Sequence, residues 1–365
     1  MYLKQLKLNN FKNYDSATVS FDSNVNCLVG NNGVGKTNLL DAIYYLSFCK
    51  SFFNPLDSQN VREGADFFAI HGTYQFDDTA IVAACTFQNG QKKMRWNGKS
   101  CRAFSEHVGR VPLVMVSPSD QLMIIGGSEL RRKFIDGVIA QVDHDYLSHL
   151  LHYQKAVAQR NRVLRAFADG QLADADLLAV WDDQLVQHGK VLLERRRLFL
   201  TEFTPLFDKY YQFMSHQQEA PQLRYITQIE NPDQLGQYLH SSRQRDMAAQ
   251  HSTVGPHKDD LDIILGKLSL RRFGSQGQQK TVTLALKLAQ FDYIYRSYEI
   301  KPILLLDDIF DKLDMERISQ LLDLVGGDAF GQVFLTDTQP GRLEQIFARF
   351  PHIDYTLNHI PLPSA

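Results

Sequence analysis

The chain has 365 residues, of which 44% are apolar, and its formal net charge is −2 at pH 7. This length fits two domains, or one large domain with an added lobe. A nearly neutral chain has no overall attraction for nucleic acid or anionic lipid, so any site for a polyanion must be a local patch. The N-terminus lacks a signal-peptide pattern, and no stretch reaches the roughly 20 apolar residues of a membrane span. We expect a cytoplasmic protein, not a transporter with its own membrane domain.

The four cysteines are Cys27, Cys49, Cys85 and Cys101, and none of them forms a C-x-x-C pair. A disulfide framework or a cysteine-ligated metal is therefore not expected, and scattered thiols suit a reducing cytosol. Cys27 and Cys85 lie in apolar, strand-like runs, so we expect both to pack in a core.

The first 115 residues are rich in strand patterns. Leu6 and Leu8 alternate with polar neighbours, and residues 25–29 form an apolar run typical of a buried strand. Two Asn-Gly pairs, at 89–90 and 97–98, favour the positive φ angles of tight hairpin turns. Residues 80–87 and 91–96 should therefore pair antiparallel. With a further buried strand over 111–116, this part predicts a mixed sheet with an antiparallel meander.

Residues 30–37 read Gly-Asn-Asn-Gly-Val-Gly-Lys-Thr and fit the phosphate-loop pattern G-x-x-x-x-G-K-[ST]. The loop follows the predicted strand, and from Lys36 onward apolar residues recur at helical spacing. Its glycines should expose backbone N–H groups to phosphate oxygens. Lys36 should reach the β- and γ-phosphates of ATP, and Thr37 should ligate Mg²⁺. The predicted cofactor-binding residues of the loop are Gly30, Asn31, Asn32, Gly33, Val34, Gly35, Lys36, Thr37 and Asn38.

The middle of the chain, residues 129–240, has few turn signals and long helical periods. Apolar stripes over 144–167 and 177–214 predict packed helices, because no strict heptad persists. Basic residues gather in the same region. Between 131 and 165 there are seven basic and three acidic residues, and 195–197 is a run of three arginines. This pattern favours either a surface that contacts phosphate backbones or simply a solvated helix face.

After residue 250 the strand signals return, at 261–265, 268–270, 303–306 and 333–335, with a helix over 281–295. The final residues, with Pro361 and Pro363, are expected to fray. Asp307 follows the buried run 303–306, so it should hold the Mg²⁺ shell as a metal ligand. Asp308 is placed to orient or deprotonate an attacking water, or else it caps a helix or forms a structural ion pair.

Residues 275–278, Ser-Gln-Gly-Gln, precede a predicted helix and resemble the ABC signature motif, with Gln in place of its first Gly. The alternative is an ordinary helix cap, since serine is a good N-cap residue. More than 230 residues separate this half of the site from the phosphate loop. That layout predicts an ATPase head that folds from both ends of the chain and carries an insertion.

Residues 255–260, Gly-Pro-His-Lys-Asp-Asp, combine one histidine with two carboxylates. A metal site is one interpretation, but no second cluster offers the missing ligands. We favour a structured turn beside the nucleotide or a dimer surface.

Together these motifs resemble the RecF family of DNA replication and repair proteins, relatives of SMC and ABC-type ATPase heads. The resemblance covers nearly the whole chain. Its residues are Leu8, Phe11, Asn13 and Tyr14 of an L-x-x-F-x-N-Y opening, 30–38, 117–122 through 126–127 to 131–136, 159–161, 255–261, 275–280 and 304–314. Two segments depart from the family pattern: Ser119-Asp120-Gln121-Leu122 stands where Glu-Asp-Leu is frequent, and Asp311-Lys312-Leu313-Asp314 stands where Ser-Glu-Leu-Asp is common. Asp314 should still touch a partner protomer, the roles of 311 and 312 are open, and Gln121 is a candidate Q-loop residue.

The resemblance implies an α/β fold: an ABC/SMC-type P-loop ATPase head with an inserted helical lobe. Residues 1–125 would form the N-terminal part of the head, 126–245 the lobe, and 246–365 the C-terminal part with the signature and Walker B motifs. The catalytic set would be Lys36, Asp307, Asp308 and Ser275. Ser275, Gly277 and Gln278 would contact the nucleotide bound to the opposite protomer.

The resemblance also implies a weak, DNA-dependent ATPase that forms an ATP-dependent homodimer. It would bind single-stranded, gapped and duplex DNA in repair, recombination and the SOS response to DNA damage. With RecO and RecR it would help load RecA at single-strand gaps, and hydrolysis would release the DNA. The alternative is an ABC-type ATPase subunit that energises a protein or membrane partner. That reading predicts a short helical subdomain before a standard signature, whereas this chain has a larger helical region.

Overall fold

The computed structural model describes residues 1–365 apart from 170–174, 216–219, 311–313, 328 and 361–365. The expectations for Asp311, Lys312 and the last five residues lie outside this described part. The chain forms two compact units. The first unit combines Met1–Asp120 with Lys287–Ala365, and the second unit is Gln121–Leu286. The second unit thus contains Ser275, and the three-part division at 125/126 and 245/246 stays a prediction.

The first unit contains a parallel sheet with the strand order β14-β3-β13-β12-β8. Every residue of β3, β8, β12 and β13 is buried, as expected of parallel strands covered on both faces. The strands predicted at 25–29 and 303–306 are confirmed. The bounds are β3 (Val25–Val29), β8 (Leu113–Val116), β12 (Ile303–Leu306), β13 (Val333–Asp337) and β14 (Tyr355–His359).

The edge strand β14 is not among the predicted strands, the last of which is 333–335. Its sequence, Tyr-Thr-Leu-Asn-His, has no apolar run, and none of its residues is fully buried. Its backbone pairs with β3, from Tyr355↔Val25 to His359↔Val29. This segment is therefore a strand because its backbone pairs with β3, and its own sequence lacks the apolar pattern of a buried strand.

A second sheet of the first unit is antiparallel, with the order β2-β1-β4-β5-β6-β7. The predicted meander is confirmed, since β5 pairs with β6 and β6 with β7 across the two Asn-Gly turns. Asn89 (φ 51°) and Asn97 (φ 48°) both have the left-handed backbone that these turns require. The bounds are β1 (Tyr2–Phe11), β2 (Tyr14–Ser20), β4 (Phe67–Phe76), β5 (Thr79–Gln88), β6 (Gln91–Trp96) and β7 (Lys99–Ser100).

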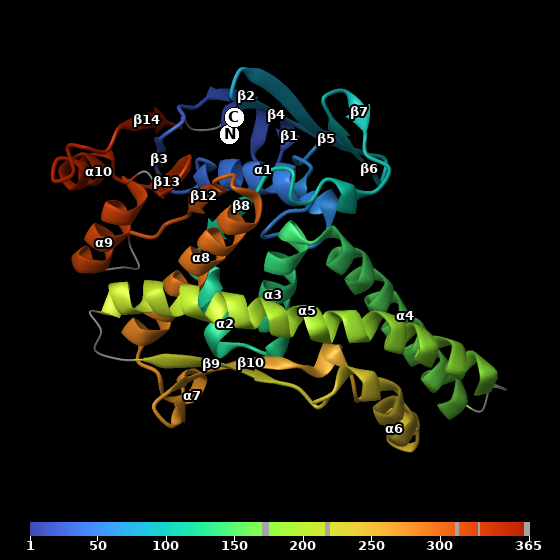
Figure 1. Ribbon diagram of the computed structural model, residues 1–365. Helices are drawn as coiled ribbons and strands as arrows, with labels where there is room; N and C mark the ends of the chain where they lie inside the picture. The colour runs from blue at the N-terminus through green and yellow to red at the C-terminus, as the bar shows by residue number, and fades with distance from the viewer. Residues whose placement is uncertain (170–174, 216–219, 311–313, 328, 361–365) are drawn as a thin grey trace. The chain divides into compact units, whose positions relative to one another are not determined.

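Helix α1 (Lys36–Phe48) packs against strands of both sheets. Figure 1 shows it in blue, beneath β1 and β4. One apolar core unites α1 with both sheets, and Cys85 belongs to it. The buried Gln332 amide ties the chain ends together, since its Oε1 accepts from Leu3 N at 2.7 Å and its Nε2 donates to Leu3 O at 2.8 Å. The other helices that lie wholly in this unit are α9 (Met315–Val325) and α10 (Pro340–Phe347).

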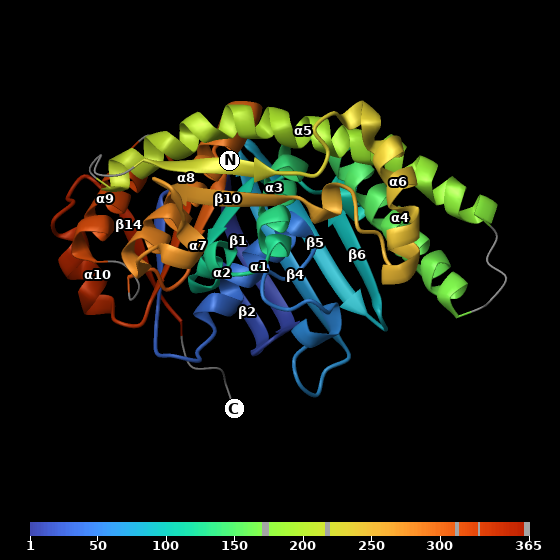
Figure 2. The ribbon, with the colours of Figure 1, turned by 90° about the horizontal axis from the view of Figure 1, so that it is seen from below.

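The second unit is mainly helical, as predicted for residues 129–240. The two long predicted helices are confirmed as α4 and α5, which pack on each other. In both Figure 1 and Figure 2, α5 runs alongside β9 and β10. The helices are α2 (Leu122–Ile125), α3 (Ser128–Val142), α4 (His144–Ala168), α5 (Ala175–Ser215), α6 (Leu235–Ala249) and α7 (Leu270–Phe273), and α8 (Gln276–Tyr298) crosses the unit boundary.

A three-stranded antiparallel sheet, β11-β10-β9, completes the second unit. Strand β9 (Pro221–Ile226) lies inside the region for which long helices were predicted, and no strand was predicted there. Exposed residues alternate along it with less exposed ones, and it pairs with β10 (Asp260–Leu265). The strand predicted at 268–270 is shorter, because β11 (Leu268–Ser269) ends where α7 begins. The 3-10 helices are η1 (Asp57–Asn60), η2 (Phe104–Glu106), η3 (Pro118–Gln121), η4 (Pro232–Gln234) and η5 (Pro256–Lys258).

Within the described residues, no helix is both long enough and apolar enough to cross a bilayer.

Candidate nucleotide-binding site

The polar site of the first unit is built where three adjacent parallel strands end. β3 leads into the phosphate loop, β12 into Asp307, and β13, which lies between them, ends at Thr336 and Asp337. The carboxyl ends of neighbouring parallel strands are where open α/β sheets place ligands. Residues more than 260 positions apart therefore meet: Thr37 Oγ1 lies 3.0 Å from Asp307 Oδ1.

The phosphate loop is held from outside by the opening motif of the chain. Asn13 Nδ2 donates to Val34 O at 3.0 Å, and its Oδ1 accepts from Asn38 Nδ2 at 2.7 Å. Gly35 has φ 112°, and a Cβ there would lie 2.6 Å from Asn13 Nδ2 and 2.7 Å from Tyr14 Oη. Only glycine fits this position. The sequence marks Asn13 and Tyr14 only through the family resemblance, whereas the structure gives Asn13 a supporting role at the loop.

Lys36 begins α1 and is 9% exposed. Its Nζ donates to the carbonyls of Gly30 at 2.7 Å and Asn31 at 2.9 Å, so the ammonium lies within the curve of the loop. Burial lowers the pKa of Lys36, while the carboxylates of Asp308, Asp337 and Asp307 oppose that shift. A cation held among backbone amides and carbonyls in this way is suited to the phosphates of a nucleotide.

Asp307 is 4% exposed and accepts two hydroxyl hydrogen bonds on the same oxygen. Thr37 Oγ1 donates to Oδ1 at 3.0 Å and Thr336 Oγ1 at 2.9 Å. Burial raises the pKa of Asp307, the nearby Asp308 carboxylate adds to this, and the two hydroxyls oppose it. Sequence reasoning missed Thr336, because a threonine at a strand end carries no motif.

Asp308 adopts φ 50°, which is uncommon for a residue other than glycine. Its backbone N–H donates to Thr336 Oγ1 at 2.8 Å, so Thr336 joins both aspartates. Such a backbone conformation costs on the order of 1–3 kcal/mol and tends to occur at functional sites. The structure thus brings together Lys36, Thr37, Asp307 and Asp308, the set predicted from sequence for the first unit.

These residues fit a magnesium nucleotide. A threonine hydroxyl and a buried carboxylate at hydrogen-bond distance offer the oxygen ligands that Mg²⁺ prefers. The glycine loop, packed so closely that no Cβ fits at Gly35, leads into the N-terminus of the 13-residue helix α1, where phosphate is favoured.

The signature segment lies in the second unit and forms a reciprocal cap on α8. Ser275 Oγ accepts from Gln278 N at 3.2 Å, and Gln278 Oε1 accepts from Ser275 N at 2.8 Å. Ser275 therefore does cap a helix, as the alternative interpretation expected, and its side chain remains exposed. The adjoining Gln279 Oε1 accepts from Nε2 of Gln121, the candidate Q-loop residue, at 3.0 Å. The contact of Ser275, Gly277 and Gln278 with a nucleotide stays a prediction.

Asp314, expected at a partner surface, caps α9. Its side chain accepts from Arg317 N at 3.0 Å and also pairs with the Arg317 guanidinium. These contacts help to lower the pKa of Asp314.

The Gly-Pro-His-Lys-Asp-Asp segment is a structured turn containing η5. His257 Nδ1 lies 2.8 Å from Tyr153 Oη and its Nε2 lies 3.1 Å from Ser252 O. Asp259 and Asp260 are engaged by Arg196 and Arg131. In the described part of the chain, no group of three or more His, Cys, Asp or Glu side chains is arranged to hold a metal.

The arginines of this region are largely structural. Arg131, Arg160 and Arg196 are 4%, 0% and 2% exposed and lie in ion pairs, so the reading of these three as contacts to a phosphate backbone is wrong. The exposed basic side chains of the two groups are those of Lys133, Lys155, Arg162, Arg165 and Arg195.

Comparison with known proteins matches the family described as "RecF/RecN/SMC N terminal domain" over residues 2–350. The DNA replication and repair protein RecF of Flavobacterium johnsoniae is 44% identical over 347 residues, covering 95% of this chain and 96% of that protein. Among solved structures, "the recombination mediator protein RecF-ATPrS in RecFOR pathway" is 27% identical, with a TM-score of 0.88, over 99% of this chain and 96% of that one. The Smc head domain of Pyrococcus furiosus, at 16% identity and a TM-score of 0.55 over 99% of this chain and 94% of that one, shares the fold. The chain has an ABC/SMC-type P-loop ATPase head fold and belongs to the RecF family.

Proposed function

We propose that this protein is an ATP-dependent DNA clamp of replication and recombinational repair. The observation that carries the proposal is the convergence of Lys36, Thr37, Asp307 and Asp308 at one edge of the parallel sheet. The similarity to RecF proteins, including a structure described with ATPrS, supports ATP as the nucleotide.

In the proposed site, Lys36 leaves the carbonyls of Gly30 and Asn31 and donates to the β- and γ-phosphates. Thr37 and Asp307 hold Mg²⁺, which neutralises phosphate charge when it is bound. Asp308, whose backbone φ is 50°, orients the attacking water or accepts its proton. Asp is one methylene shorter than Glu, so slow turnover is expected.

In the proposed dimer, Ser275 of a second copy would contact the outer face of the γ-phosphate. ATP would then favour the dimer, because it touches both protomers only in that state. The dimer would close on single-stranded, gapped or duplex DNA and act with RecR and RecO in loading RecA. Hydrolysis would remove the bridging phosphate and release the DNA.

The proposed contact between Ser275 of one copy and the ATP bound to the other can be tested by light scattering. The mass of the protein is measured with ATP–Mg²⁺, with ADP and without nucleotide. We expect a dimer with ATP only. Ser275→Arg should stay monomeric while still binding ATP, because its nucleotide loop is intact. Dimers of Ser275→Arg with ATP would contradict the trans role of this serine.

A further inference from the structure

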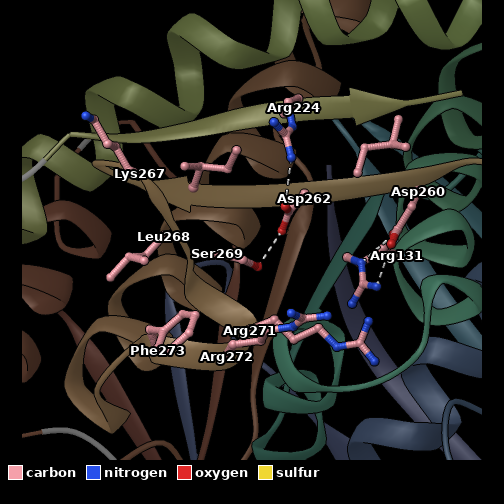
Figure 3. A pocket seen from close by; sticks show the side chains of 12 residues that line it. Arg131, Arg224, Asp260, Asp262, Lys267, Leu268, Ser269, Arg271, Arg272 and Phe273 are labelled. Carbon is pink, nitrogen blue, oxygen red and sulfur yellow. Dashed lines mark hydrogen bonds and ion pairs between the residues drawn. The ribbon is translucent and has the colours of Figure 1, made fainter.

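A pocket of about 360 Å³ lies in the second unit, beside the three-stranded sheet. Residues of β9, β10, β11 and α7 line it, together with Arg131 of α3 and Lys267 of the turn between β10 and β11 (Figure 3). None of the residues assigned to the nucleotide site belongs to this lining, although α7 ends two residues before Ser275. The pocket therefore has no role in the function proposed so far.

Both carboxylates of the pocket are already neutralised by arginines. Asp260 accepts from Arg131 Nε at 2.6 Å and from its Nη2 at 3.0 Å, a bidentate pair. Asp262 accepts from Arg224 Nη2 at 3.4 Å and from Ser269 Oγ at 2.7 Å. The dashed lines of Figure 3 mark these contacts. The acidic side chains thus offer little to a cationic ligand.

Three further cations of the pocket have no such partner in the described part of the chain. Lys267, Arg271 and Arg272 are exposed, and none makes a hydrogen bond or ion pair with another described residue. In Figure 3 the Arg271 and Arg272 side chains extend in the direction of Arg131, whereas Lys267 lies at the other end of the pocket. On a chain whose net charge is −2, this is a concentrated local excess of positive charge. Its spread along the pocket suits several anionic groups in a row better than one ion.

The same pocket exposes large apolar side chains. Phe273 is 64% exposed and Leu268 is 53% exposed, and both belong to its lining. An exposed aromatic ring beside arginines offers a stacking surface for a planar base, as in sites for single-stranded nucleic acid. In a duplex the faces of the bases are stacked on one another, so they are not available to such a ring.

We propose that this pocket binds a single-stranded nucleic-acid segment, with Arg271, Arg272 and Lys267 on successive phosphates and Phe273 stacked on a base. The inference rests on the proposed DNA-binding function and names a surface for it. Contacts of this kind fix the strand without reading its sequence. In the free protein the three cations repel one another, which a polyanion relieves.

The test measures binding of a fluorescent single-stranded oligonucleotide to the full chain with ATP–Mg²⁺ across a salt series. In the double variant Arg271→Ala/Arg272→Ala, log K for association should fall less steeply with log salt. The slope should become less negative by roughly 0.7 for each lost phosphate contact. At 0.1 M salt, losing both contacts corresponds to roughly 25-fold weaker binding. Phe273→Ala should weaken single-strand binding roughly 5- to 150-fold and spare a blunt duplex.

The matched control is Lys190→Ala with Arg243→Ala, which removes two cations of the same unit that are each paired with a carboxylate. The control should bind as the wild type does, and all variants should keep the wild-type circular dichroism spectrum. If the Arg271/Arg272 variant binds as tightly as the wild type, this inference alone is overturned. If the wild type does not bind at all, the proposed function is overturned as well. Loss of ATP-dependent dimers in the Arg271/Arg272 variant would assign the cations to a second copy's nucleotide, and would also overturn the inference.

Discussion

Replacing Arg160 with alanine should severely destabilise the second unit. The side chain of Arg160 is fully buried and donates to Asp182 Oδ1 at 2.6 Å, Asp246 Oδ2 at 2.7 Å and Ser252 Oγ at 3.0 Å. Asp182 keeps a second partner, since Arg243 Nη2 lies 2.8 Å from its Oδ2. Asp246 is fully buried and has no other described cation partner. In the Arg160→Ala variant its negative charge would therefore be buried without an opposite charge.

Breaking a buried ion pair by removing one partner costs about 3–5 kcal/mol, and we expect Arg160→Ala to fall in that range. The assay is urea unfolding followed by Trp181 fluorescence in a Trp96→Phe background, which leaves a single tryptophan, in the second unit. Adding Asp246→Asn should recover part of the loss, because it removes the stranded charge.

The matched control is Arg243→Ala, whose side chain is 34% exposed and shares the same acceptor, Asp182. Its cost should be about 1 kcal/mol or less, as for ion pairs open to solvent. A loss below about 1 kcal/mol for Arg160→Ala would refute the structural role of this arginine and restore the interpretation of a phosphate-contacting surface.

Three further predictions concern the first unit. Lys36→Arg should abolish phosphate release from ATP without unfolding the protein, and full turnover would remove the basis of the phosphate-loop assignment. Gly35→Ala should weaken binding of a fluorescent ATP analogue far more than Gly33→Ala, because both have positive φ but only at Gly35 would a Cβ meet other atoms within 4 Å; equal losses would show that the contact with Asn13 is unimportant. Burial lowers the pKa of His107 to about 4. Between pH 6.5 and pH 4 this histidine is therefore protonated in the unfolded chain but neutral in the folded chain. The folded state consequently loses stability as the pH falls through this range. Between pH 7 and 4.5 the unfolding free energy of the wild type should fall by roughly 2–3 kcal/mol more than that of His107→Gln, and parallel pH profiles would contradict this assignment.

The nucleotide site of the first unit was predictable because its polar residues lie in short, contiguous sequence motifs. The loop pattern at 30–37 and the apolar run before Asp307 each specify a strand end, and parallel strands bring those ends together. Thr336 could not be found in this way, because its role depends on β13 lying between β3 and β12. Strand order is a tertiary property that no local pattern encodes.

The basic residues show the opposite limit of sequence reasoning. Arg131, Arg160 and Arg196 stand in stretches that look like solvated or phosphate-binding helix faces. Their carboxylate partners are up to 129 positions away, as for Arg131 and Asp260, so the pairing is invisible in a local window. By contrast, Arg271 and Arg272, which pair with no described carboxylate, occur as an inconspicuous pair before the signature. Burial, not charge density along the sequence, separates the two classes.

The central claim is that ATP controls the grip of this protein on DNA. It is tested most directly by measuring binding of a fluorescent duplex, with and without a single-stranded gap, in ATP–Mg²⁺, in ADP and without nucleotide. The account predicts tight binding with ATP–Mg²⁺ that collapses with ADP and is absent from Ser275→Arg. Failure to bind in every nucleotide state at moderate salt would contradict the DNA clamp and favour an ATPase that acts on a protein partner.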